Sequence, residues 1–318
     1  MYSIAHYFRL FLLTGMTFLA GAGLSAQALG DSEAIGRWDL EVQYGDRWVP
    51  SWLEVKLSGN KALVGHFVGP GGSARPIAEV HDKDGLISFS IPPQWSGSQY
   101  MHLTGTVNGD AMEGNILDHM GHARGFRGKR APALLHAPPQ QWSDPRPLLQ
   151  ENSLAGWVPM DGNRQNQWVV KDGVLRSPAS GVNLMTEETF MDFKLHIEFR
   201  YPEGSNSGVY LRGRYEVQVE DSYGKQPDSH YLGGVYGFLT PNENAARKAG
   251  EWQSYDITLV GRRVTVVANG KTIIHNQIIP GITGGALDSR ESDPGPLYLQ
   301  GDHGPVEYRN ITIATPVD

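Results

Sequence analysis

The sequence predicts an all-β protein with two folded parts, and three observations support this. Short runs that alternate apolar and polar residues recur along the chain, and turns rich in Gly, Asn and Asp separate them, as in strands rather than helices. The 318 residues include 39 Gly, 13 Tyr and 8 Trp, a composition typical of β-proteins with many turns. A proline-rich stretch at 131–152 divides the alternating runs into two groups.

Residues 1–28 have the pattern of a secretory signal peptide. Arg9 supplies the positive charge, residues 10–24 form the apolar segment, and Ala26-Gln27-Ala28 is an A-x-A cleavage site. No second apolar run of membrane-spanning length follows, and the chain has no cysteine for a disulfide or a lipid anchor. We expect cleavage near Ala28 and a soluble periplasmic or secreted protein, with an uncleaved N-terminal anchor as the alternative.

The region 31–130 is expected to form a small antiparallel β-barrel or sandwich, since closure into a barrel would remove exposed strand edges. Turn sequences such as Asn108-Gly109-Asp110 separate its runs. His119 and His122 in one of these loops offer metal-type donors, but a polar turn is the simpler interpretation. The predicted strands are 37–44, 52–57, 62–68, 86–91, 100–107 and 112–117.

Residues 131–152 contain five prolines and no periodicity, which predicts a semi-rigid linker that lies along one of the domains. The second domain, 153–318, again shows short strands, and two packed antiparallel sheets would bury their apolar faces. Its predicted strands include 168–170, 193–201, 254–259, 263–268, 272–275, 297–300 and 306–313.

The stretch 206–221 alternates most strictly and is interpreted as one strand with a core face and a ligand face. Donors and acceptors on its polar face would recur every 6–7 Å or so, given the rise of about 3.3 Å per strand residue. This spacing suits a polyhydroxylated ligand, although a salt-bridge ladder on an exposed strand is an alternative. The apolar positions are Val209, Leu211, Tyr215, Val217 and Val219, and the polar positions are Tyr210, Arg212, Arg214, Glu216, Gln218 and Glu220.

Charge argues against one class of partner. The net charge is −7, and the 27 basic residues are scattered rather than clustered, so no footprint for a phosphate backbone is visible. Nucleic acid is therefore not an expected partner, whereas a carbohydrate is.

Several motifs in the second half carry a resemblance to a known family. They include Asn206-Ser207-Gly208-Val209-Tyr210-Leu211-Arg212, Tyr215-Glu216-Val217-Gln218 and Leu299-Gln300 followed by His303-Gly304. In this order, over roughly residues 150–316, they resemble the 3-keto-disaccharide hydrolase domain family. The resemblance implies a concanavalin A-like jelly-roll sandwich, export, and action on glycosides whose sugar is oxidised to a ketone at C3. Family members usually carry an apolar residue at the position of Glu220.

The matched positions imply a candidate site. A ketone at C3 acidifies the C2 proton, so one base suffices to begin elimination of the glycosidic oxygen, after which water adds. The resemblance implies Glu216 or His303 as the base and Arg212 as the cationic donor to the developing enolate. No cofactor is required, although a divalent metal in place of Arg212 is an alternative. The implied substrate ligands are Gln218, Asp221, Gln300, Tyr210 and Asn206.

Three other functions stay open. Glu216-x-Gln218-x-Glu220 has the spacing of the E-x-D-x-E strand of retaining jelly-roll glucanases, with Glu216 as nucleophile and Glu220 as acid/base, but the middle acid is an amide here. A lectin-like binding module would share the fold without catalysis, although clustered charges are costly for binding alone. The N-terminal domain could carry the activity, but it shows no acid/base set.

Overall fold

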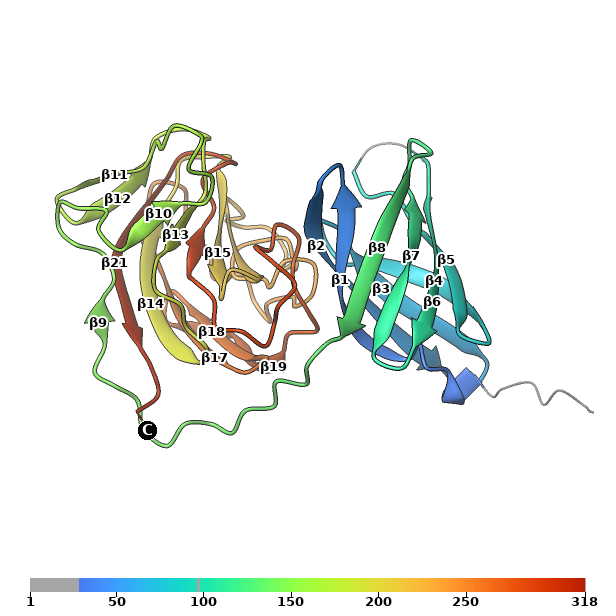
Figure 1. Ribbon diagram of the computed structural model, residues 1–318. Helices are drawn as coiled ribbons and strands as arrows, with labels where there is room; N and C mark the ends of the chain where they lie inside the picture. Colours follow the sequence, from blue (N-terminus) through green and yellow to red (C-terminus); the bar gives the residue numbers. More distant parts are fainter. Residues whose placement is uncertain (1–28, 96–97, 318) are drawn as a thin grey trace, which may run out of the picture.

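The computed structural model describes residues 29–95 and 98–317, and the signal-peptide prediction for residues 1–28 lies outside this range. The described part is all-β apart from one 3-10 turn, η1 (Leu29–Asp31), and consists of a closed barrel followed by a two-sheet sandwich (Figure 1). None of its helices has the length and apolarity needed to cross a membrane. The predicted fold class, a small β-barrel preceding a jelly-roll sandwich, is confirmed.

The N-terminal part is a barrel in which each strand pairs antiparallel with the next and β8 closes onto β1. Alternate residues such as Trp38, Leu40 and Val42 of β1 point inward and are buried. The sequence prediction missed β4 and β8. Their bounds are β1 (Gly36–Tyr44), β2 (Arg47–Ser58), β3 (Ala62–Val68), β4 (Arg75–Lys83), β5 (Leu86–Ile91), β6 (Met101–Asn108), β7 (Ala111–Leu117) and β8 (Ala123–Arg130).

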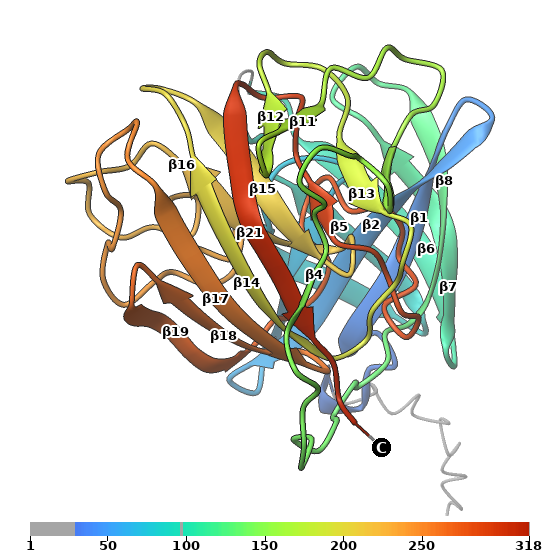
Figure 2. The ribbon, with the colours of Figure 1, turned by 90° about the vertical axis from the view of Figure 1, so that its left-hand side faces the viewer.

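The chain then runs beneath the molecule to β9 (Arg146–Pro147), which pairs with the last strand (Figure 1). One sheet of the sandwich has the order β10 (Trp157–Pro159), β13 (Leu184–Thr186), β20 (Tyr298–Leu299), β15 (Asn206–Leu211) and β16 (Tyr215–Glu220). The other has the order β11 (Val169–Lys171), β12 (Val174–Ser177), β21 (Val306–Ala314), β14 (Phe193–Arg200), β17 (Gln253–Val260), β18 (Arg263–Ala268) and β19 (Lys271–Ile278). Strands β21, β14, β17, β18 and β19 lie side by side toward the viewer in Figure 2.

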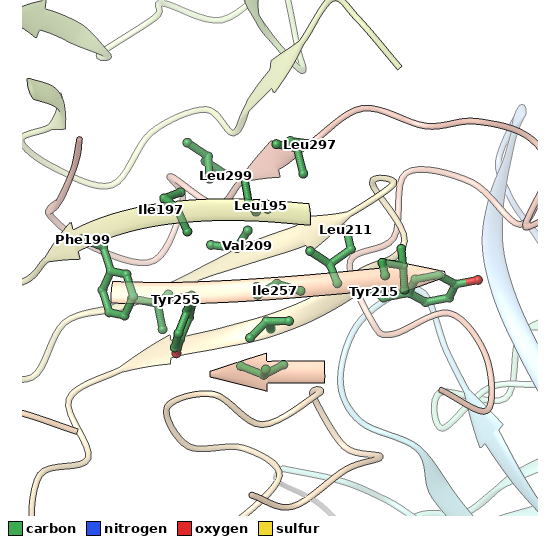
Figure 3. Close-up of a cluster of buried hydrophobic side chains, with 14 of the residues drawn as sticks. Leu195, Ile197, Phe199, Val209, Leu211, Tyr215, Tyr255, Ile257, Leu297 and Leu299 are labelled. Carbon is green, nitrogen blue, oxygen red and sulfur yellow. The ribbon is translucent and has the colours of Figure 1, made fainter. Parts of the chain in front are cut away.

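The sandwich core lies between the two sheets. Leu195, Ile197 and Phe199 of β14 are buried against Val209 and Leu211 of β15 (Figure 3). At roughly 25 cal/mol per Å² of buried apolar surface, such side chains supply most of the drive to fold. The apolar residues at alternate positions of these strands therefore hold the two sheets together.

The prediction of one strand over 206–221 is wrong, because the stretch is a hairpin. Strand β15 ends at Leu211 and β16 begins at Tyr215, after a turn in which Arg212 and Gly213 have φ of 53° and 67°. The three-residue loop leaves even-numbered residues opposite even-numbered residues, as in the pair Tyr210 and Glu216. Alternation therefore continues through the turn without a break, which is why a period of two does not reveal it.

The barrel and the sandwich share a packed interface. Trp52 of β2 is fully buried within the sandwich core, with its ring 5.4 Å from that of Phe238 in an edge-on arrangement. The hydroxyl of Ser289 donates to Leu40 O at 2.6 Å. Arg37 of the barrel donates to Pro280 O of the sandwich at 3.3 Å. Because buried polar groups need partners, these contacts fix how the barrel sits on the sandwich.

Candidate functional site

A cavity of about 660 Å³ lies where the barrel meets the sandwich, and we call it the central cavity. The sandwich contributes polar side chains from β15, β16 and the segment after β20, including Glu216, Gln218 and His303. The barrel contributes Trp48 and Trp95. Concave sites with a few convergent polar groups at a domain interface are the usual location of small-molecule binding.

The β15–β16 hairpin places four of the predicted residues on one face of this cavity. Asn206 and Tyr210 come from β15, and Glu216 and Gln218 come from β16. Their strand partners are also even-numbered, so all four side chains leave the sheet on the same side. The ligand face predicted from the alternation is thus assembled from two strands rather than one.

Glu216 is buried at the sheet surface of the cavity. Burial raises the pKa of its carboxyl to about 8, and the charge of Asp302 adds to this, while the Tyr210 hydrogen bond and His303 act in the opposite direction. Glycine at position 208 makes room for the carboxylate, since a Cβ there would lie 2.3 Å from Glu216 Oε1. A carboxyl with a pKa near 8 can exchange a proton at neutral pH, as a general acid or base must.

Tyr210 connects this carboxyl to the backbone. Its hydroxyl lies 2.9 Å from Glu216 Oε2 and 2.8 Å from Gly284 O. A hydroxyl has one proton, so Tyr210 donates it to the carboxylate in one state and to Gly284 O in the other. The ring is held by stacking on Tyr298 at 4.1 Å between centroids. Tyr210 therefore supports Glu216 in both protonation states.

His303 and Asp302 form the second titratable pair of the cavity. Asp302 Oδ1 lies 2.6 Å from His303 Nδ1, and this hydrogen bond together with the charge raises the pKa of the imidazole. Burial acts to raise the pKa of Asp302, but the hydrogen bond and charge of His303, together with hydrogen bonds from Asn183 and the backbone, outweigh it and the net shift is downward. With Nδ1 engaged by the carboxylate, Nε2 is the ring nitrogen that a ligand can reach.

Two carboxamides complete the polar lining. Gln218 accepts a hydrogen bond from Val219 N at 3.1 Å through its Oε1. Within residues 29–95 and 98–317, Gln300 Oε1 is buried and has no hydrogen-bond partner. Because a buried acceptor without a donor is costly, a ligand hydroxyl at this position would be stabilising.

Arg212, the predicted cationic donor, does not belong to the cavity, and its assignment beside Glu216 is wrong. It occupies the first position of the hairpin turn, where φ of 53° directs the side chain out of the strand alternation. The guanidinium is fully buried and donates to Tyr215 Oη at 2.8 Å and Gly261 O at 3.1 Å. Its role in the structure is to join the turn to the β17–β18 connection.

Asp221 and Glu220 also lie outside the cavity lining. Asp221 accepts a hydrogen bond from Gly204 N at 2.9 Å, so it closes a turn and is not placed as a substrate ligand. Glu220 is nearest to Lys225, at 3.8 Å. The pair Glu216 and Glu220, required by the retaining-glucanase alternative, is therefore not assembled in the central cavity.

Several lining residues were missed by the sequence reasoning. Asp302 directly precedes His303 in a matched motif, and its carboxylate could have been considered there. Asn183, whose Nδ2 lies 2.8 Å from Tyr298 Oη, carries no such signal. Trp95 belongs to the barrel, and only the tertiary structure brings it to this cavity.

The loop that contains His119 and His122 is a polar turn around Asp118. This carboxylate accepts hydrogen bonds from the backbone of Met120 and His122 and pairs with Arg124 at 2.7 Å. Among the described residues, no group of three or more His, Cys, Asp or Glu side chains is arranged to hold a metal ion.

Comparison with solved structures gives several partial likenesses. A "putative glycosyl hydrolase" from Parabacteroides distasonis is 31% identical, with 54% of this chain and 83% of that chain covered, at a TM-score of 0.46. A second from the same organism is 23% identical, with 54% and 100% covered, at 0.44. A non-specific endo-beta-1,3(4)-glucanase of family GH16, SCLam, is 10% identical, with 57% and 94% covered, at 0.36. At these TM-scores the likenesses do not bear on mechanism.

No protein with a curated description matches the chain. The family described as the 3-keto-alpha-glucoside-1,2-lyase-like domain matches residues 144–314, which include the hairpin, Gln300, Asp302 and His303. This confirms the resemblance seen in the sequence motifs. The match spans more than half of the 318 residues, and the protein therefore belongs to the 3-keto-alpha-glucoside-1,2-lyase-like family of carbohydrate-active domains.

Proposed function

We propose that the protein cleaves the glycosidic bond of 3-keto-glycosides, with Glu216 as the base that removes the C2 proton. The observation that supports this most directly is the burial of Glu216 in the central cavity, where its pKa is about 8. A carbon acid next to a ketone needs a stronger base than an ordinary carboxylate, and desolvation provides one.

The reaction then proceeds by elimination. Glu216 takes the C2 proton, and the electrons of the C2–H bond form a C2–C3 double bond while O3 becomes an enolate oxygen. The enolate then re-forms the C3 ketone, the C2–C3 electron pair becomes the C1–C2 double bond, and the glycosidic oxygen leaves C1 with the electrons of the C1–O bond. His303 also faces the cavity, and its hydrogen bond to Asp302 raises the pKa of the imidazole, which favours the charged form. In its charged form it donates a proton to the leaving oxygen or a hydrogen bond to O3. Addition of water across C1–C2 gives the free 3-keto sugar.

The carboxamides orient the sugar ring in this proposal. Gln300 Oε1, which has no donor among the described residues, accepts from a sugar hydroxyl. Gln218 and Asn206 lie on the same face and bind further hydroxyls. Because these contacts are made with parts of the sugar away from C2, they position the C2 proton against the carboxylate.

The test uses methyl 3-keto-glucoside and unoxidised methyl glucoside as substrates. Wild-type protein should release methanol from the first and leave the second intact. Glu216→Gln should lower kcat/KM by about 10²-fold or more, the low end of what general acid–base catalysis supplies. Glu220→Leu, a matched change of a carboxylate on the same strand but outside the cavity, should stay within a few-fold. Equal losses in both variants, with unchanged circular dichroism, would contradict the assignment.

One observation favours a second function, hydrolysis of an unoxidised glycoside. The pKa of Glu216 is raised and that of Asp302 is lowered in the same cavity, the combination that a glycosidase uses for its acid and its ionised partner. In that case methyl glucoside itself would be cleaved, and Asp302→Asn would abolish this activity. The same two substrates therefore separate the functions.

A further inference from the structure

A second cavity, of about 620 Å³, occupies one end of the barrel, and we call it the barrel-mouth cavity. Residues Arg47, Val49, Pro70, Gly71 and Trp95 line both this cavity and the central cavity. The two spaces therefore meet at a common boundary. Mouths of β-barrels commonly hold small ligands, and an eight-stranded barrel is wide enough for one.

The two cavities differ in chemistry. Inward-pointing Val42, Phe67 and Ile116 and the side chain of Met101 make the wall of the barrel-mouth cavity apolar. The central cavity instead presents amides, carboxyls and imidazole. A molecule that fills both must have a polyhydroxylated end over Glu216 and an apolar end in the barrel.

Trp95 stands at the shared boundary with 76% of its surface exposed. An exposed indole between two cavities offers a flat surface to a ring, and stacked or edge-on aromatic pairs add about 0.5–1.5 kcal/mol beyond buried area. Phe67 and Tyr44 also line the barrel-mouth cavity, and three aromatic side chains favour an aromatic ligand over an aliphatic chain.

Arg75 is a half-buried cation of this cavity, whereas Arg47 at its boundary is exposed. Its guanidinium lies 5.4 Å from the centre of the Phe67 ring and donates to Pro92 O at 3.3 Å, and its Nε is buried with no partner in the described residues. Arg124, which also lines the cavity, is neutralised by Asp118 at 2.7 Å. No carboxylate of the described residues forms an ion pair with Arg75, so an anionic ligand group would find an uncompensated cation there.

We propose that the barrel mouth binds the aglycone of the substrate, and that this aglycone is an aromatic ring bearing a carboxylate. The inference rests on the proposed function, since it places the glycosidic oxygen at the boundary of the two cavities. Glu216 acts on the sugar in the central cavity, Trp95 stacks on the ring, and Arg75 pairs with the carboxylate. The barrel thereby selects aryl glycosides over disaccharides.

Turnover of 3-keto-trehalose and of three 3-keto-glucosides, with methyl, phenyl and 4-carboxyphenyl aglycones, tests this. Wild type should have the highest kcat/KM on the 4-carboxyphenyl substrate. Trp95→Ala should raise the ratio of KM on each aryl substrate to KM on the methyl substrate about three- to tenfold. Arg75→Met should lower kcat/KM tenfold or more on the 4-carboxyphenyl substrate and less than twofold on the phenyl one. Tyr223→Ala, an exposed aromatic outside both cavities, is the matched control and should change nothing.

Binding of free 4-hydroxybenzoate, measured by calorimetry, separates this inference from the proposed function. Binding should persist in Glu216→Gln and weaken at least tenfold in Arg75→Met. Absence of binding to wild type, or equal binding to wild type and Arg75→Met, overturns the inference, as does a preference for a 3-keto-disaccharide over the aryl substrates. Failure to cleave methyl 3-keto-glucoside would instead overturn the proposed function.

Discussion

Replacing Glu216 by Gln should stabilise the protein, and by an amount that depends on pH. Burial holds the pKa of the folded carboxyl at about 8, against 4.5 for an ordinary glutamate. Below about pH 4 both folded and unfolded chains carry the proton, so the carboxyl has no effect there. As pH rises toward 8 the unfolded chain releases the proton while the folded chain keeps it, and the folded state loses stability.

The size of this loss follows from the shift. At about 1.4 kcal/mol per pKa unit, the penalty reaches at most about 5 kcal/mol at pH 8. Gln cannot ionise and keeps an oxygen to accept from Tyr210, so the variant escapes the penalty. One kcal/mol corresponds to about 2–4 °C in Tm for a domain of this size, which predicts a Tm about 10 °C above wild type at pH 8.

Calorimetric Tm values at pH 4, 6 and 8 for wild type and Glu216→Gln check this. The difference should be near zero at pH 4 and grow with pH, while Glu203→Gln, a change at an exposed carboxyl, should follow wild type throughout. A constant difference across the range would mean that the folded and unfolded chains release this proton at the same pH, so that the pKa of Glu216 is not raised by folding. That outcome would refute the argument that desolvation makes it a stronger base.

Two further substitutions test how the Glu216 carboxylate is positioned and how the barrel is docked on the sandwich. Gly208→Ala should lower kcat on methyl 3-keto-glucoside by tenfold or more with little change in Tm, because its Cβ would displace the Glu216 carboxylate, and steady-state kinetics with a thermal scan measure both. Trp52→Ala should lower the free energy of unfolding by about 3–5 kcal/mol, since it leaves a cavity at a fully buried position in the sandwich core. A loss smaller than about 1 kcal/mol, measured by denaturant titration, would show that the barrel is not docked through this residue.

The fold could be predicted well because its signal is local. Alternation and turn residues mark strands such as β1 and β3 directly, and the same alternation identified the face that carries Glu216 and Gln218. Strands β4 and β8 were missed because their side chains alternate weakly, with exposed or half-buried residues at most positions. A strand with few buried apolar residues lacks the regular apolar positions by which alternation is recognised.

The positions of Arg212 and of the barrel residues in the central cavity could not be predicted from alternation in the sequence. A left-handed residue in a turn leaves the alternation of its neighbours, so counting by twos assigned Arg212 to the wrong side of the sheet. Trp95 and Arg47 reach the central cavity because the barrel docks on the sandwich, through contacts such as that of Trp52, and these contacts join residues far apart in sequence. No periodicity within a strand reports on such a contact.

The docking of the barrel on the sandwich also affects Glu216, the proposed base. Gly285 N donates to Pro70 O of the barrel at 3.0 Å, and a Cβ at Gly284 would lie 2.1 Å from Gly72 O, so the barrel loop lies directly against these two glycines. Gly284 O in turn accepts from Tyr210, whose hydroxyl contacts Glu216. The position of Tyr210 therefore depends on a loop outside the matched region 144–314. Because a base must be held within a fraction of an ångström of its productive position, we propose that the barrel is part of the active unit and more than an appended domain.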